Sequence, residues 1–186
     1  MTWLLTLFMA CSPQAEAITN GQTGYNIGLS GALDLGGEAR PLQFTTQYGV
    51  GMPITFWRGH YDPSFALGRY WGGGLTPRVF WNNQRVRLSL PVRVERGMDL
   101  IAIGIRIYGG LGPLLEWNET HQSVGVTAHM GATVKYRVNK NLGPMLSIQG
   151  GCDILDGAIN PRLEFRLGLD FSARIRPPSS VDNQIQ

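Results

Sequence analysis

Charge is scarce in this chain of 186 residues. Charged residues make up 16% of it, well below the roughly one quarter of an ordinary soluble domain. Beyond the first residues, no apolar run approaches the ~20 residues that a membrane-spanning helix needs. Cysteine is also rare, at two residues. The sequence therefore argues against a helical membrane protein and against a disulfide-rich secreted fold.

Lysine is nearly absent, because Lys135 and Lys140 are the two lysines among 16 basic residues. The net charge of +3 could indicate an anionic partner. The arginines are scattered along the chain, however, and no DNA- or RNA-binding motif is present. Zinc-binding motifs, a P-loop and paired-cysteine spacings are also missing. We therefore expect no nucleic-acid partner, no cofactor and no metal.

The N-terminus predicts an export signal. Residues 3–10 read WLLTLFMA, an apolar stretch too short to span a bilayer, and Ala15-Glu16-Ala17 follows in the A-x-A cleavage pattern. This predicts a signal peptide at 1–17, a β-barrel at 18–176 and a polar tail at 177–186. A lipid-attachment junction at Ala10-Cys11 is the alternative. Cleavage after Ala17 would remove Cys11 and leave Cys152 as an unpaired small residue on a strand.

What the chain does contain is alternation. Val86, Leu88, Leu90, Val92 and Val94 share one parity, with Arg, Ser, Pro and Glu between them. A period of two is typical of a β-strand with one apolar face. Similar segments recur about eight times, the region 65–81 least clearly, and helical periodicity is absent. The sequence predicts an all-β, up-and-down antiparallel barrel of about eight strands.

Two barrels fit this pattern. A soluble barrel, such as a lipocalin binding an apolar ligand, turns its apolar face inward. A transmembrane barrel turns that face to lipid and fills its interior with polar side chains. The polar faces here are rich in Gly, Ser, Thr and Ala, which suit the narrow interior of an eight-stranded barrel. This composition favours the transmembrane solution.

Charges inside such a barrel must be paired. Arginine suits this role because its planar guanidinium donates to carboxylates from several positions. The alternation predicts a lumen charge network, whose members are Asp34, Arg85, Arg87, Arg93, Glu95, Arg106, Lys135, Arg137, Asp153, Arg162, Glu164, Arg166, Asp170 and Arg174.

The segment 166–173, RLGLDFSA, resembles the last-strand assembly signal of small bacterial outer-membrane barrels, the group of the OmpA transmembrane domain and OmpX-like proteins. The resemblance covers residues 18 to about 176. It implies location in the bacterial outer membrane, contact with outer-membrane lipid and recognition by the barrel-assembly machinery. The chain departs from the family by continuing for ten residues past Arg176.

The resemblance also implies periplasmic termini. Connections at 36–41, 82–84, 110–122 and 154–159 would then face outward, and those at 58–64, 96–98 and 139–142 would face the periplasm. Loops this short leave no room for extended adhesin loops.

His121-Gln122-Ser123 is the sharpest catalytic hypothesis. Lipid A deacylases of the same fold use a His-x-Ser pair with a carboxylate, and residues two apart on a strand face one way. Asp153 or Glu116 would orient the histidine, although the flanking residues differ from that family's motif. The main expectation is a non-enzymatic barrel with a structural or surface-interaction role and no wide pore. A lipid-modifying hydrolase and a soluble lipocalin-like barrel are the alternatives, and the oligomeric state is open.

Overall fold

In the computed structural model the backbone is described for residues 23–39, 42–62, 67–100, 103–138 and 141–175. Within these ranges, side chains at 34, 36–39, 42–45, 60–62, 67, 100 and 174 lie outside the description. The strands are β1 (Thr23–Ala39), β2 (Leu42–Gly51), β3 (Ile54–Asp62), β4 (Leu67–Leu75), β5 (Arg78–Trp81), β6 (Arg85–Ser89), β7 (Val92–Leu100), β8 (Ile103–Asn118), β9 (Gln122–Tyr136), β10 (Leu142–Leu155) and β11 (Ala158–Ile175). No helix that could cross a membrane occurs among the described residues.

These eleven segments make eight barrel strands, because three long strands are each interrupted for two residues at a proline. Pro53 separates β2 from β3, Pro77 separates β4 from β5, and Pro91 separates β6 from β7. Proline has no N–H to donate to the sheet. The residue before a proline still donates across the gap, from Met52 N to Pro77 O and from Thr76 N to Pro91 O, both at 3.0 Å. Each pair of segments therefore continues as one strand.

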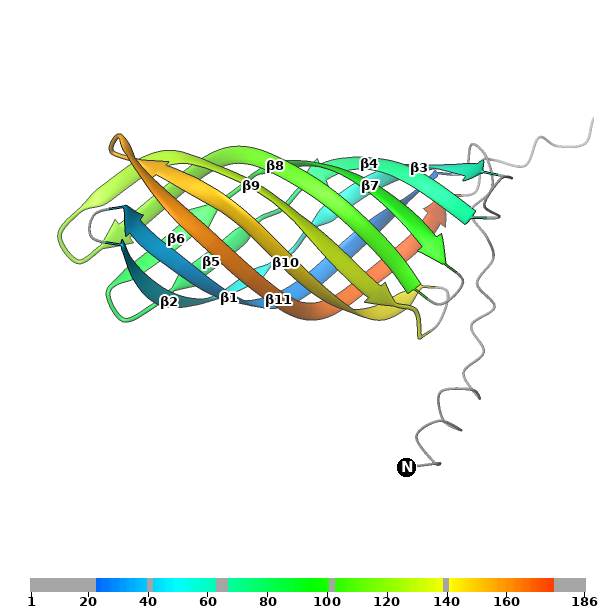
Figure 1. The fold of residues 1–186 in the computed structure, drawn as a ribbon, viewed down its shortest axis with the longest axis horizontal. Coiled ribbons are helices and arrows are strands. Elements are labelled where there is room, and N and C mark those ends of the chain that lie inside the picture. The colour runs from blue at the N-terminus through cyan, green and yellow to red at the C-terminus, as the bar shows by residue number, and fades with distance from the viewer. Residues whose placement is uncertain (1–22, 40–41, 63–66, 101–102, 139–140, 176–186) are drawn as a thin grey trace, which may run out of the picture.

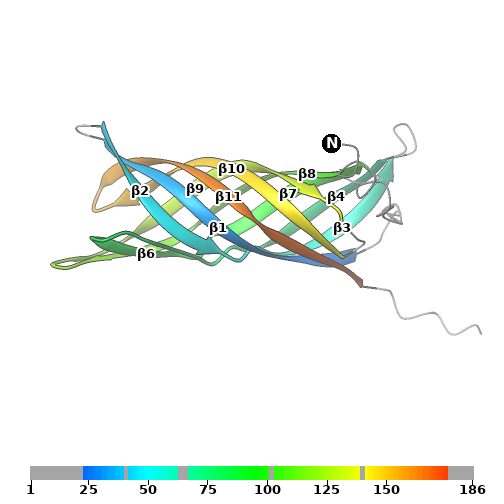
Figure 2. The same cartoon turned by 90° about the horizontal axis from the view of Figure 1, so that it is seen from below.

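The sheet closes on itself. β1 pairs with β11 from Thr23↔Ile175 to Gly36↔Arg162, and all neighbouring strands are antiparallel. Figures 1 and 2 show the strands tilted around a long barrel, with β1 and β11 side by side. The predicted fold, an all-β antiparallel barrel of eight strands, is confirmed. We call the end where Thr23 pairs with Ile175 the terminal end, and the other the opposite end.

The barrel is polar inside and apolar outside. The buried side chains are mostly charged or hydroxylated, and Asp153 and Asp170 are fully buried. The exposed side chains include more than thirty large hydrophobic residues, such as Leu167 at 69% exposure and Ile107 at 67%. A soluble lipocalin-like barrel needs the reverse arrangement, so that alternative does not fit. Only a lipid environment covers such an outer face favourably.

Aromatic side chains on the outer face form groups toward both ends of the barrel. Tyr48 pairs with Trp81, with Trp117 two strands further round, toward the opposite end. Tyr25 pairs with Phe56 toward the terminal end. Tyr48 and Phe56 are eight positions apart on one strand, roughly 20 Å along the barrel axis at the usual rise and tilt. This spacing matches the ~25 Å apolar band of outer-membrane barrels, which aromatic girdles flank.

Glycine makes room for rings inside the barrel. Five interior rings each lie directly across from a glycine on a neighbouring strand: Trp57 from Gly24, Phe80 from Gly49, Tyr70 from Gly97, Tyr108 from Gly131 and His129 from Gly110. A Cβ on Gly97 would come within 2.1 Å of the Tyr70 ring. The abundance of glycine therefore reflects packing in a narrow lumen as well as turns.

Two of the predicted connections are wrong. Residues 110–122 were expected to form a loop, but β8 runs on to Asn118 and β9 begins at Gln122. Gly110 and Gly112 weaken the sequence pattern here, while Leu114 and Glu116 still face inward. Residues 96–98 were expected to turn, but β7 continues to Leu100, because Gly97 accommodates Tyr70 rather than a bend. The predicted signal peptide and tail lie outside the described residues.

The orientation of the faces predicts the effect of an outward charge. We expect Leu167→Arg, placed in the middle of the apolar face, to lower the free energy of unfolding by about 2–4 kcal/mol. Urea titration of the barrel refolded into lipid vesicles measures this. Gln122→Arg, an exposed position at the opposite end, serves as the control with an expected change near zero. Equal, small effects at both positions would mean that lipid does not cover Leu167.

Candidate functional site

The interior side chains form a charge network that follows the lumen. Near the opposite end, Asp153 from β10 lies between two arginines, with its Oδ2 2.9 Å from Nη1 of Arg87 and 2.8 Å from Nη1 of Arg162. Arg87 from β6 also donates from Nε and Nη2 to Oε2 of Glu116 at 2.9 and 2.6 Å. Arg85 approaches the other Glu116 oxygen at 3.5 Å. These contacts tie four strands together across the lumen: β6, β8, β10 and β11.

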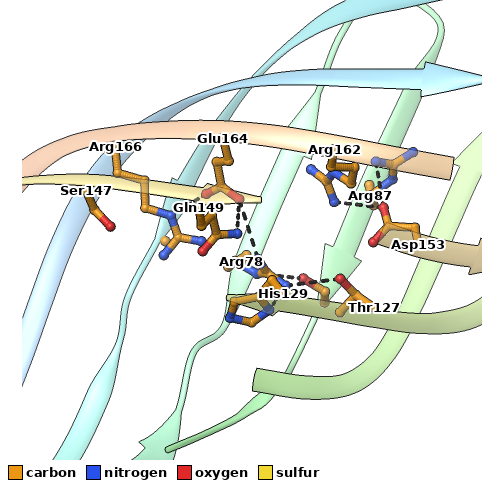
Figure 3. Close-up of polar contacts among 12 residues, drawn as sticks. Arg78, Arg87, Thr127, His129, Ser147, Gln149, Asp153, Arg162, Glu164 and Arg166 are labelled. Carbon is orange, nitrogen blue, oxygen red and sulfur yellow. Dashed lines mark hydrogen bonds and ion pairs between the residues drawn. The ribbon is translucent and has the colours of Figure 1, made fainter. Parts of the chain in front are cut away.

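A second group, with Glu164 of β11 at its centre, fills the middle of the lumen (Figure 3). Its carboxylate accepts from Nε of Arg166, and its Oε2 accepts from Nε2 of Gln149 at 2.5 Å and from Nη1 of Arg78 at 3.5 Å. Arg78 crosses from β5, and its Nε donates to Oγ of Ser89 at 3.1 Å.

The Arg78 guanidinium also reaches the β9 wall. Its Nη2 lies 3.4 Å from Oγ1 of Thr127 and 3.5 Å from Nδ1 of His129. Arg78 is 1% exposed, so this side chain lies wholly inside the barrel and links four strands. The guanidinium therefore extends from β5 across the lumen toward β9 and β11.

The third group lies toward the terminal end. Asp170 faces Arg106 from β8 at 2.8 Å and Lys135 from β9 at 2.6 Å. Lys135 also donates to Ser172 Oγ at 2.6 Å, and Arg137 forms an ion pair with Asp99.

One further ion pair lies beside an interior ring. Arg93 pairs with Glu95 at 2.8 Å and lies 3.7 Å above the centre of the Tyr108 ring. A cation over an aromatic face is attracted by the ring quadrupole. The same ring donates its hydroxyl to Gln149 Oε1 at 3.2 Å, so Tyr108 connects this pair to the middle group.

One arrangement recurs through these groups: a carboxylate sits between two cations. Asp153, Glu164, Asp170 and Glu116 each contact two basic side chains. Burying an isolated charge is very costly, and a pair compensates only when its remaining donors and acceptors are also satisfied. Sharing each carboxylate explains how the interior holds more basic than acidic residues.

The structure places twelve of the fourteen predicted network residues in the lumen contacts just described. The side chains of Asp34 and Arg174 lie outside the described residues. Three members were missed. Arg78 follows the disturbed stretch Gly72-Gly73-Gly74, Glu116 lay in the expected loop, and Asp99 followed the expected turn. The signal that could have found Arg78 is the alternation after Pro77: Val79 and Trp81 face outward, so Arg78, which has the opposite parity, faces the lumen.

The proposed catalytic pair lies at the opposite end, beside the β10–β11 hairpin. Asp156 and Gly157 form its tip, with φ of 49° and 79°, as tight hairpins favour. Ser123 Oγ donates to Oδ2 of Asp156 at 2.6 Å, and His121 Nε2 lies 3.6 Å from the same oxygen. Asp156, rather than Asp153 or Glu116, is therefore the carboxylate beside both residues. A histidine that activates serine must accept the hydrogen bond of the serine hydroxyl, whereas here the Asp156 carboxylate accepts that hydrogen bond.

The shared carboxylates predict strong destabilisation when one is neutralised. We expect Asp170→Asn to cost about 3–5 kcal/mol, because Arg106 and Lys135 would remain buried without their counter-ion. Asp156→Asn is the matched control, since Asp156 is 61% exposed and asparagine tolerates positive φ. Urea unfolding in vesicles compares them. A loss below 1 kcal/mol for Asp170→Asn would contradict the role given to the network.

Comparison with known proteins supports the fold. No family profile and no curated protein matches the chain. The structure of Ail, the attachment invasion locus protein of Yersinia pestis, in complex with the heparin analogue sucrose octasulfate, is 13% identical, with 83% of this chain and 100% of that chain covered and a TM-score of 0.52. Neisserial surface protein A is 11% identical, with 79% and 96% covered and a TM-score of 0.52. The outer membrane enzyme PagL is 15% identical, with 81% and 99% covered and a TM-score of 0.47. The closed ring of eight strands and the apolar outer face together make this chain a small β-barrel of the outer-membrane type.

Proposed function

We propose that this protein is a non-enzymatic outer-membrane barrel with a structural or surface-interaction role, whose lumen is closed to ions and solutes. The observation that carries the proposal is the interior network itself. Asp153, Glu164 and Asp170 each bring side chains from at least three strands together across the lumen. A conducting pore needs the opposite arrangement, in which charges line a wall and leave the axis to water.

The space left between these side chains supports the same conclusion. The interior cavity bounded by Arg78, Thr127, His129, Gln149 and Glu164 measures about 10 Å³. One water molecule needs at least roughly this volume. The space beside Arg78 is therefore too small for a solute or a hydrated ion.

The opposite end supports a small interaction surface. Two of its described turns are short and internally hydrogen-bonded: Asn82 Oδ1 accepts from the N–H groups of Gln84 and Arg85 at 2.9 Å, and Asn118 Oδ1 accepts from His121 N at 2.6 Å. Side chains that cap their own turns hold them in one conformation. Any partner would therefore meet a compact polar rim rather than long loops.

Two partners are part of this proposal. Outer-membrane lipid would cover the apolar face. The barrel-assembly machinery would read β11, whose Leu167, Leu169 and Phe171 all point outward. That strand ends at Ile175, at the terminal end, and pairs with β1 to close the ring.

A closed lumen predicts that the barrel does not conduct ions across a membrane. In planar bilayers we expect the wild-type barrel to give no conductance steps above the bare membrane. We expect the triple variant Arg78→Ala, Glu164→Ala, Arg166→Ala to give small steps, because it removes the central carboxylate together with both arginines that pair with it and so leaves none of the three charges buried without a partner. Regular steps from the wild type would overturn the closed-lumen proposal.

The hydrolase alternative rests on the contacts of Ser123 and His121 with Asp156. We expect wild-type protein to release no fatty acid from purified lipopolysaccharide, because the serine hydroxyl donates its hydrogen bond to the Asp156 carboxylate rather than to a histidine base. Mass spectrometry of the lipid measures acyl loss, with Ser123→Ala as the matched control. Acyl release that disappears in Ser123→Ala would establish the hydrolase instead.

A further inference from the structure

Three arginines lie on the outer face, and all three are near the terminal end. Arg58 is four residues from the end of β3, Arg69 two residues from the start of β4, and Arg96 four residues from the end of β7. Among strand residues with described side chains, no other charged residue points outward. Among these described side chains, outward positive charge is therefore confined to one side of one end.

These arginines surround one tryptophan. Trp71 lies directly between Arg58 and Arg96 in the strand register, and Arg69 is two residues away on the same face. The Trp71 ring is 62% exposed, and the Arg96 guanidinium carbon lies 5.1 Å from its centre. Aromatic and basic side chains are typical of the level where lipid headgroups begin. Clustered cations at this level attract an anion.

A groove begins at this cluster and runs into the apolar band. Trp71 and Arg96 line one end, and Leu163 of β11 lines the other, with a volume of about 710 Å³ between them. The groove crosses five strand-to-strand steps of ~4.8 Å, or roughly 24 Å measured across the strands around the barrel. Because barrel strands are tilted by about 40°, this path descends roughly 15 Å along the barrel axis, which is half of a ~30 Å hydrocarbon core.

Small residues hollow the groove. One cross-strand row reads Gly73, Val94, Gly109, Met130, Gly150 and Leu163, so that glycine alternates with a large side chain. The adjacent row carries Ala132 between Ile107 and Ile148. Gly150 has open space where a Cβ would stand, so the depression results from the absence of side chains there.

We propose that this groove binds one glycerophospholipid with an anionic headgroup. Arg58 and Arg96 contact the phosphate, Trp71 lies at the glycerol level, and an acyl chain occupies the groove over Gly109 and Gly150. The inference rests on the outer-membrane placement proposed above, with the terminal end in the phospholipid leaflet.

Charge decides between a lipid and a second copy of the chain. In a symmetric dimer through this face, the Arg58–Arg96 cluster of one chain would lie against the same arginines of the second chain or against its apolar outer face. The described outer face of the strands carries no carboxylate to pair with it. A phosphate supplies the missing charge, because guanidinium groups bind phosphate through paired hydrogen bonds.

The test is native mass spectrometry of the full-length barrel, extracted in mild detergent and incubated with equal amounts of phosphatidylglycerol and phosphatidylcholine. We expect the wild type to retain one phosphatidylglycerol in preference. The double variant Arg58→Gln, Arg96→Gln should lower that retention roughly fivefold for each arginine lost.

The groove is tested separately. Gly150→Leu fills it and should abolish retention of both lipids, whereas Gly31→Leu, at an outward glycine on β1 outside the groove, should retain lipid as the wild type does. Equal retention of the two lipids by the wild type, or equal effects of the two leucine variants, would overturn the proposal. Retention of lipopolysaccharide in place of phosphatidylglycerol, or a dimer without lipid, would also overturn it. Each variant is first tested for the heat-shifted gel mobility of a folded membrane barrel, so that failed insertion is distinguished from lost lipid binding.

Discussion

Backbone hydrogen bonding in a medium without water is the constraint on which this structure depends. Lipid offers no donor or acceptor, so every spanning strand must pair on both sides. The β1–β11 ladder satisfies this requirement by closing the ring. The same requirement explains the prolines: each removes a donor, yet the N–H groups of Met52 and Thr76 still find carbonyls across the gaps. Long strands can therefore contain proline without opening the barrel.

Closure with eight strands produces a narrow lumen, and this determines the chemistry inside. Large rings fit only opposite glycine, as Tyr70 does opposite Gly97. Charges fit when they are paired, either one to one, as Arg93 is with Glu95, or around a shared counter-ion, as Arg106 and Lys135 are around Asp170. A lumen packed in this way stabilises the barrel through contacts between distant strands. In the closed-lumen proposal the same packing leaves no route for solutes through the barrel.

The period of two predicted most of the fold and nearly the whole set of lumen residues, because parity alone decides which face a strand residue occupies. It failed where glycine was read as a turn. Gly97 and Gly110 lie within strands and make room for Tyr70 and His129. Reading them as connections hid Asp99 and Glu116. The sequence could not predict which lumen charges pair with each other. The pairing of Arg78 with Glu164, for example, depends on which distant strands face each other across the closed ring.

Arginine and glycine have different surroundings on the inner and outer faces of this barrel. Inside, Arg87 and Arg162 share a carboxylate, and glycine opposite a ring is filled by that ring. Outside, Arg58 and Arg96 flank Trp71 with no carboxylate on the described outer face of the strands, and Gly150 opens onto empty space. The interior satisfies its own charges and fills its own hollows. The outer face does neither at this one place, so the complement to both, an anion joined to an apolar chain, has to come from the membrane.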